Sequence, residues 1–115
     1  MEDQDLWIVK RYIDECMFDP KNANDIESFE IQSYSRWAAG EIFSRAAEES
    51  FNPPPCVTGI FSKDLIDIID EFAFEMDCYS ERSDDERCRR MFVIARETAD
   101  DILYFYIQER RKNNG

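Results

Sequence analysis

Carboxylates are the side chains of this sequence whose type and spacing could support chemistry. Residues 64–77 carry six acids with no base among them, and residues 97–101 carry three more. Both segments have helical apolar periodicity, so each would present its acids in rows along a helix. Oxygen ligands of this kind suit Mg²⁺ or Mn²⁺. Two such helices would form a metal site if their carboxylates faced each other.

The second acidic segment resembles a motif of a known enzyme family. Residues 97–105 read ETADDILYF, which is similar to the second acidic motif of the all-α NTP pyrophosphatases of the MazG type, a Glu-x-x-Asp followed by apolar and aromatic residues. In that family an upstream Glu-Glu-x-x-Glu helix completes the magnesium site, whereas residues 70–75 here have one residue too many. The resemblance implies a Mg-dependent nucleotide hydrolase in which the metal activates water and clamps phosphates. The implied ligands are Glu71, Glu75, Glu97 and Asp100.

Helical geometry favours a different role for the acids of the first segment. When the apolar stripe of residues 65–76 faces the core, Asp67, Asp70 and Glu71 fall on the outer side of the helix. Phe74 falls on that side as well. A buried metal site needs inward carboxylates, so we expect a solvated acidic surface with an exposed aromatic ring and no cofactor.

Our leading hypothesis is a non-enzymatic, acidic protein-interaction module. Carboxylates one helical turn apart lie about 5–6 Å from each other, a scale close to phosphate spacing along a nucleic-acid strand. The narrower hypothesis is therefore an inhibitor of a nucleic-acid-handling enzyme, of the type that phages and mobile elements encode. The alternative is that the acids only maintain solubility. The predicted partner-binding residues are Asp64, Asp67, Asp70, Glu71, Phe74, Asp77, Asp84 and Asp85.

A third hypothesis is a structural homodimer. Phe74 and Phe105 lie off the main apolar stripes of their helices, and a helix that is apolar on more than one face is either central in its domain or part of an interface. The dimer hypothesis assigns these faces to a second copy of the chain. The alternative assigns them to the other helices of the same chain.

Composition narrows the classes of function and partner. The chain has 26 acids, 14 bases and no histidine, giving a net charge of −12. Such a charge repels nucleic acids and anionic membranes, so we expect neither to bind directly and expect a protein partner with a basic surface. The sequence also lacks a Gly-rich phosphate loop and a nucleophile motif. These absences favour a binding protein over an enzyme.

Cysteine usage and the first residues indicate the compartment. The chain starts without the basic residues and apolar run of a signal peptide. Its cysteines, Cys16, Cys56, Cys78 and Cys88, are not clustered. We expect reduced core thiols in the cytoplasm, with a disulfide between Cys78 and Cys88, which flank a predicted turn, as the minority alternative.

The apolar spacing predicts four helices in a single domain of residues 1–115. The first covers about residues 4–17. The second begins at an Asn24 cap and runs to about Ser50, with a small-residue patch at residues 38–40 where another helix could approach closely. Residues 51–59 contain three consecutive prolines, which favour an extended crossover loop.

The last two helices complete the prediction. The third begins at a Ser62 cap and runs to about Tyr79, and the fourth follows a capping box at Ser83–Glu86 and runs to about Lys112. The basic residues of segment 87–96 would pair with acids of segment 64–86 across this hairpin. The expected fold is an all-α, irregular four-helix bundle with a Pro-rich crossover loop between the second and third helices.

Overall fold

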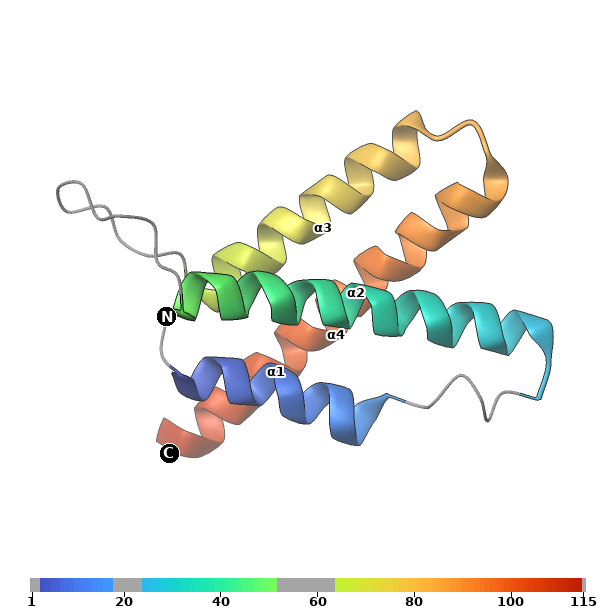
Figure 1. Cartoon of the computed structure of the whole chain (residues 1–115). Helices are drawn as coiled ribbons and strands as arrows, with labels where there is room; N and C mark the ends of the chain where they lie inside the picture. Colours follow the sequence, from blue (N-terminus) through green and yellow to red (C-terminus); the bar gives the residue numbers. More distant parts are fainter. Residues whose placement is uncertain (1–2, 18–23, 52–63, 115) are drawn as a thin grey trace, which may run out of the picture.

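The computed structural model describes residues 3–17, 24–51 and 64–114. Within them the chain forms α1 (Asp3–Cys16), α2 (Ile26–Phe51), α3 (Leu65–Arg82) and α4 (Glu86–Asn114). The expected all-α four-helix bundle is confirmed. Figure 1 shows α3 and α4 as an antiparallel hairpin, with α2 crossing both and α1 beside α2. The Pro-rich loop lies outside the described residues.

Helix α4 is a central element, because it contacts each of the other three helices, as α2 does too. Its position explains why its apolar residues are not confined to one stripe. Phe105, for example, packs edge-on against Tyr12 of α1, with 5.5 Å between the ring centroids. The assignment of Phe105 to the inside of the chain therefore agrees with its partial burial against the core, and the homodimer hypothesis stays a prediction.

An aspartate caps the N-terminus of each of the last three helices. In each case a side-chain oxygen accepts a hydrogen bond from a backbone N–H of the first turn: Asp25 from Ser28 at 2.6 Å, Asp64 from Asp67 at 2.9 Å and Asp85 from Arg87 at 2.9 Å. The expected caps at Asn24 and Ser83 are therefore wrong, and Ser62 lies outside the described residues. A carboxylate satisfies the free N–H groups and also interacts favourably with the positive end of the helix dipole.

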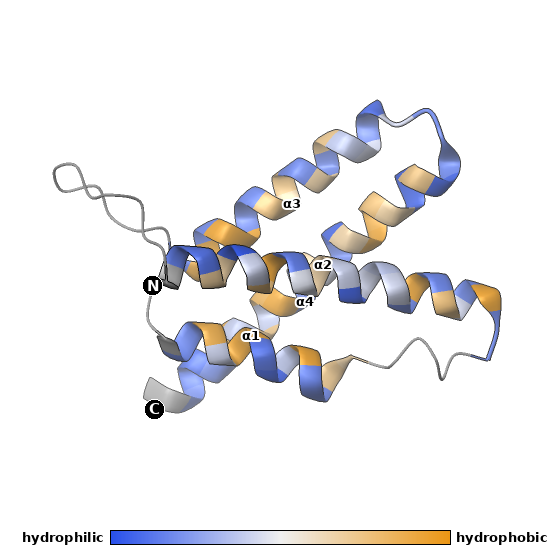
Figure 2. Ribbon diagram, in the orientation of Figure 1, coloured by the Kyte–Doolittle hydropathy of each residue, from blue (hydrophilic) through white to orange (hydrophobic). Residues whose placement is uncertain are grey.

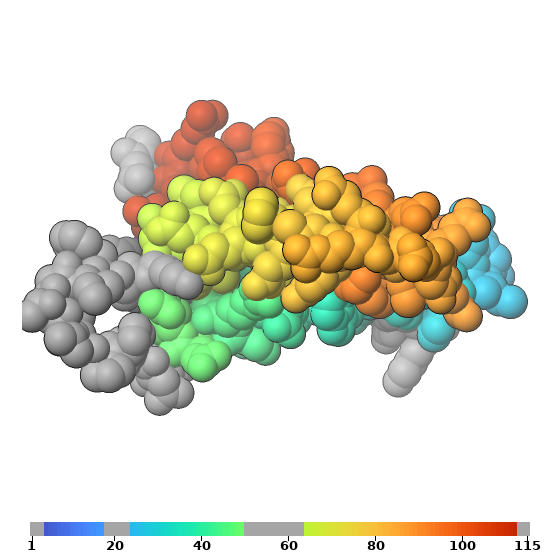
Figure 3. Space-filling model, turned by 90° about the horizontal axis from the view of Figure 1, so that it is seen from above, coloured from blue at the N-terminus to red at the C-terminus, as the bar shows by residue number. Residues whose placement is uncertain are grey.

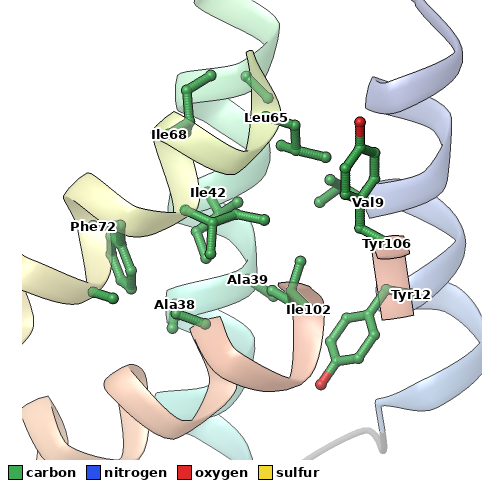
Figure 4. Packing of buried hydrophobic residues seen from close by; sticks show 14 of the residues in the cluster. Val9, Tyr12, Ala38, Ala39, Ile42, Leu65, Ile68, Phe72, Ile102 and Tyr106 are labelled. Carbon is green, nitrogen blue, oxygen red and sulfur yellow. The ribbon is translucent and has the colours of Figure 1, made fainter. Parts of the chain in front are cut away.

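The core is built from the apolar stripes that the spacing predicts. Figure 2 shows apolar and polar residues alternating along the helices, and Figure 4 shows the buried apolar side chains meeting between them. Ala38 and Ala39 of α2 and Ala95 and Ala99 of α4 are fully buried, so small side chains allow close packing of helices. The largest fully buried side chains are Phe72, Ile42, Leu65, Ile69, Ile102 and Val9.

Gly40 does not belong to this close contact, although the sequence places it in the same small-residue patch. Among the described residues, a Cβ atom at Gly40 would meet no atom within 4 Å apart from its chain neighbours and the backbone of its own helix. Gly40→Ala is therefore expected to stabilise the fold by about 1 kcal/mol, because alanine restricts the unfolded chain and favours the helix. Urea unfolding measures the change. A loss of stability would show that something else occupies the space beside Gly40.

The described residues also test the expectations about membrane spans and cysteines. None of the described helices is both long enough and apolar enough to cross a bilayer. Cys16, Cys78 and Cys88 are free thiols, so the alternative of a disulfide between Cys78 and Cys88 is wrong. Cys16 and Cys88 are exposed and Cys78 is half-buried, which corrects the expectation of core thiols for these three. Cys56 lies outside the described residues.

Two buried acids hold α1 against α4. Glu109 and Asp5 are each at most 7% exposed. Arg11 Nη1 lies 2.8 Å from Glu109 Oε2, and Arg110 Nη1 lies 3.4 Å from Asp5 Oδ1. Each nearly buried carboxylate thus has a cationic partner from the other helix, which compensates for the loss of water.

The Arg11–Glu109 pair predicts a loss of stability in acid. The Arg11 guanidinium holds the pKa of Glu109 below its ordinary value of 4.5. The resulting stability is present above pH 4.5 and is lost as the pH falls through the lower folded-state pKa. In urea unfolding at a series of pH values, Glu109→Gln should flatten the acid side of the stability curve. Glu97→Gln, at an exposed site of the same helix, should leave it unchanged, and equal effects would contradict the assignment.

Candidate functional site

The outer face of α3 combines an exposed aromatic ring with carboxylates. Phe74 is 69% exposed, and Asp67, Asp70 and Glu71 are exposed on the same helix. Asp70 and Glu71 lie one turn before Phe74, which makes them its neighbours on the helix surface. We call Asp67, Asp70, Glu71 and Phe74 the α3 surface. Figure 3 shows α3 from above, uncovered on that side, with α2 and α4 beside it.

A shallow hollow lies beside Phe74. It has a volume of about 550 Å³, and its walls are Asp70, Glu71, Phe74 and Glu75. On the opposite side of α3, residues such as Phe72 and Ala73 are buried in the core and hold the helix in place. An outward ring on a well-packed helix loses little additional conformational entropy when a partner covers it. The outward placement that the helical spacing predicts for all four residues of the α3 surface agrees with their exposure.

The other four predicted partner-binding residues either form contacts within the chain or lie far from the α3 surface. Asp64 and Asp85 cap α3 and α4, and Asp77 Oδ2 lies 3.2 Å from Arg96 Nε. Asp84 is exposed in the turn after α3. Because α3 has 18 residues, this turn is about 27 Å from the start of the helix. The structure therefore does not gather all eight predicted residues into one site.

The arginines that follow the acidic segment are largely engaged away from the α3 surface. Arg87 Nη2 lies 2.8 Å from Glu30 Oε1, and Arg90 Nη2 lies 3.0 Å from Glu27 Oε1. Both pairs join α4 to α2. The expected pairing across the α3–α4 hairpin is thus correct for Arg96 and wrong for Arg87 and Arg90. The reason is that α2 packs on α4, so that acids of α2 lie next to these two arginines.

This arrangement leaves negative charge on the outer face of α3. Within residues 3–17, 24–51 and 64–114, no basic side chain forms an ion pair with Asp67 or Asp70. Glu75 is different, because its Oε2 lies 2.7 Å from Arg45 Nη2. That contact is a close ion pair between α2 and α3. The acids of the α3 surface that have no cationic partner among the described residues are therefore Asp67 and Asp70.

One further acid extends this face. Glu81 is exposed and lies two helical turns after Phe74, so it is on nearly the same side of α3. The same helical spacing that places Phe74 outward predicts Glu81 there too. Including it lengthens the acidic face toward the turn between α3 and α4.

Comparisons with protein-family models, curated proteins and solved structures find no match. The chemistry open to the α3 surface therefore follows from its own side chains. Carboxylates and one phenyl ring can attract cations and bury apolar area. They supply neither a nucleophile with a paired base nor a cradle for phosphates.

The four ligands implied by the pyrophosphatase resemblance are not brought together. Glu75 is paired with Arg45, Asp100 is paired with Arg96, and Glu97 is exposed. No group of three His, Cys, Asp or Glu side chains in the described part of the chain is arranged to hold a metal ion. The described residues therefore do not form the metal site that the resemblance implies.

Proposed function

We propose that this chain is a protein-binding module whose α3 surface docks on a basic surface of another protein. The observation that carries the proposal is the 69% exposed ring of Phe74 among carboxylates, of which Asp67 and Asp70 have no cationic partner among the described residues. Interfaces commonly place an aromatic anchor at the centre of a polar rim. Here the anchor is Phe74 and the rim is acidic.

Charge supports a basic partner. The net charge of −12 attracts positively charged proteins over long range and speeds their encounter. At contact, Asp67 and Asp70 exchange water for lysine or arginine side chains without first losing an internal ion pair. The Phe74 ring can then bury apolar area or receive a cation on its face.

The narrower form of the proposal is that the partner is a nucleic-acid-handling enzyme and that this chain inhibits it by occupying its phosphate-binding surface. Neighbouring carboxylates on one helical face are spaced by about 5–6 Å. A row of negative charges on a rigid helix matches the surface that such an enzyme uses for a nucleic-acid backbone. Inhibition would then be competitive with nucleic acid and would need no cofactor.

Crosslinking from position 74 tests the proposal. The photoreactive residue p-benzoylphenylalanine replaces Phe74 in one variant and Tyr104 in a matched control, since Tyr104 of α4 is 68% exposed but lies outside the α3 surface. We expect one predominant product from position 74, containing a basic protein, that is lost at high salt and is absent from position 104. Equal products from both positions, or an acidic partner, would contradict the proposal.

A competition experiment tests the narrower form. The crosslinked protein is identified by mass spectrometry, purified and mixed with this chain and with duplex or single-stranded nucleic acid. Mutual displacement is expected if both occupy the phosphate-binding surface. A ternary complex of partner, nucleic acid and this chain would exclude occlusion while leaving the protein-binding role in place.

A further inference from the structure

Helix α2 carries a stripe of uncharged residues along one side. Seven of its positions recur at three- and four-residue spacing and fall within an arc of about 80° around the helix axis. We call these residues the α2 stripe: Ile26, Phe29, Ser33, Trp37, Gly40, Ser44 and Ala47. Figure 1 shows α2 in front of α4, and Figure 3 shows α2 along one edge of the molecule.

The large apolar side chains of the α2 stripe are open to solvent. Ile26 is 79% exposed, Phe29 is 50% exposed and Trp37 is 44% exposed. Trp37 lies at the edge of the stripe next to α3, where 6.1 Å separates its ring centroid from that of Phe72. Beside Gly40 there is room for a Cβ atom, since no other described side chain lies within 4 Å of that position. The described helices therefore leave an apolar face of α2 without a covering partner.

The acids of α2 all lie off this stripe. They are Glu27, Glu30, Glu41, Glu48 and Glu49. Glu27 and Glu30 are turned toward α4, where they pair with Arg90 and Arg87. The solvated side of a helix ordinarily carries charged residues, and 26 of the 115 residues of this chain are acidic. An exposed stripe of about six turns without a charge therefore favours contact with another molecule.

The α2 stripe is complementary to itself in side-chain size. Its three large side chains lie in the first half of the helix, and Gly40, Ser44 and Ala47 lie in the second half. When two α2 helices pack antiparallel about a two-fold axis, the large half of each meets the small half of the other. This register places Phe29 opposite Ala47, Ser33 opposite Ser44, and Trp37 beside Gly40 of the second copy.

Charge also favours a second copy as the occupant. A basic protein of the kind proposed for the α3 surface would find no acid on the α2 stripe to pair with. Two copies of this chain each carry a net charge of −12, so they repel each other least where they meet through uncharged residues.

We propose that this chain forms an antiparallel homodimer in which the α2 stripes of two copies pack against each other. The interface differs from the one predicted from Phe74 and Phe105, which lie on α3 and α4. It shares no residue with the α3 surface, so the inference does not depend on the proposed function.

Sedimentation equilibrium of the full chain under reducing conditions tests the dimer, with reductant present because Cys16 and Cys88 are exposed. Between about 1 and 500 μM protein, the mass should rise from 13.7 kDa toward twice that value. The dissociation constant should fall between about 50 and 500 mM NaCl, because salt screens the repulsion between the copies. A mass of 13.7 kDa at every concentration, or a dimer that weakens with salt, would overturn the proposal.

A pair of substitutions tests the antiparallel register. Ser33→Glu should raise the dissociation constant of the dimer about tenfold or more, because each interface then holds two unpaired charges. Adding Ser44→Lys to the same chain places a lysine opposite each new glutamate and should restore the affinity to within about threefold of the unchanged chain. Positions 33 and 44 are about 16 Å apart along one helix, so this pair forms only between copies. A double variant that stays as weak as Ser33→Glu would exclude the antiparallel arrangement.

Phe74→Glu is the matched control for Ser33→Glu, since it adds the same charge to the exposed face of α3. It should change the dissociation constant of the dimer by less than about twofold, and circular dichroism should show unchanged helix content in all variants. If Phe74→Glu weakens the dimer as much as Ser33→Glu does, the α2 stripe is not the interface. Urea unfolding of Gly40→Ala is accordingly measured at a protein concentration where the chain is monomeric.

Discussion

Phe72→Ala is expected to lower the free energy of unfolding by about 3–5 kcal/mol, the usual cost of removing a buried aromatic ring. Phe72 is fully buried in α3. Its ring centroid lies 6.1 Å from that of Trp37, and the Arg45 guanidinium carbon lies 5.3 Å from the centroid of the same ring. Because small domains are stable by only about 5–15 kcal/mol, the variant should lose a large share of its stability.

Phe74→Ala provides the matched control, since it makes the same chemical change two residues further along α3. Phe74 is 69% exposed, so its truncation should cost less than about 1 kcal/mol. Urea unfolding of both variants, followed by circular dichroism, gives the two values. Similar losses in the two variants would mean that α3 does not present Phe72 to the core and Phe74 to solvent.

Neutralising the α3 surface is expected to weaken binding of the basic partner by about 10- to 100-fold at low salt. The variant is Asp67→Asn, Asp70→Asn and Glu71→Gln. Each exposed ion pair contributes about 0.2–1 kcal/mol, and three pairs on one face together reach this range of affinity. The fold should persist, because all three side chains are exposed. Isothermal titration calorimetry with the partner captured through position 74 measures the effect.

The matched control removes the same charge from other helices. Glu48→Gln, Glu86→Gln and Glu97→Gln change three exposed acids of α2 and α4. This variant should bind within about threefold of the unchanged chain, because its lost charges lie on other helices, outside the α3 surface, and are screened by salt. If it weakens binding as much as the α3 variant does, the interaction depends on net charge rather than on the α3 surface.

Much of the fold follows from local sequence signals. The stripe of residues 65–76 and the alanines of α2 and α4 are periodic over several turns, so their burial could be predicted from spacing alone. The outward position of Phe74 follows from the same periodicity. The caps are harder to predict. Asn24 and Asp25 are both good N-cap residues, as are Ser83 and Asp85, and which one caps depends on where the first helical turn begins.

The ion pairs that shape the candidate site depend on distant parts of the chain. Arg87 and Glu30 are 57 residues apart, and Arg90 and Glu27 are 63 residues apart. No local pattern predicts that α2, rather than α3, meets these arginines. Asp5 and Glu109 likewise look like surface charges in the sequence, and their burial arises only because α1 packs against α4.

The most direct test of the proposed function is the salt dependence of partner binding for the unchanged chain and for the neutralised α3 variant. The dissociation constant of each is measured between about 50 and 500 mM NaCl, a range over which charge screening changes strongly. We predict that the unchanged chain weakens steeply with salt, that the variant weakens much less, and that the two converge at high salt. Equal affinities with equal slopes would contradict binding through the α3 surface.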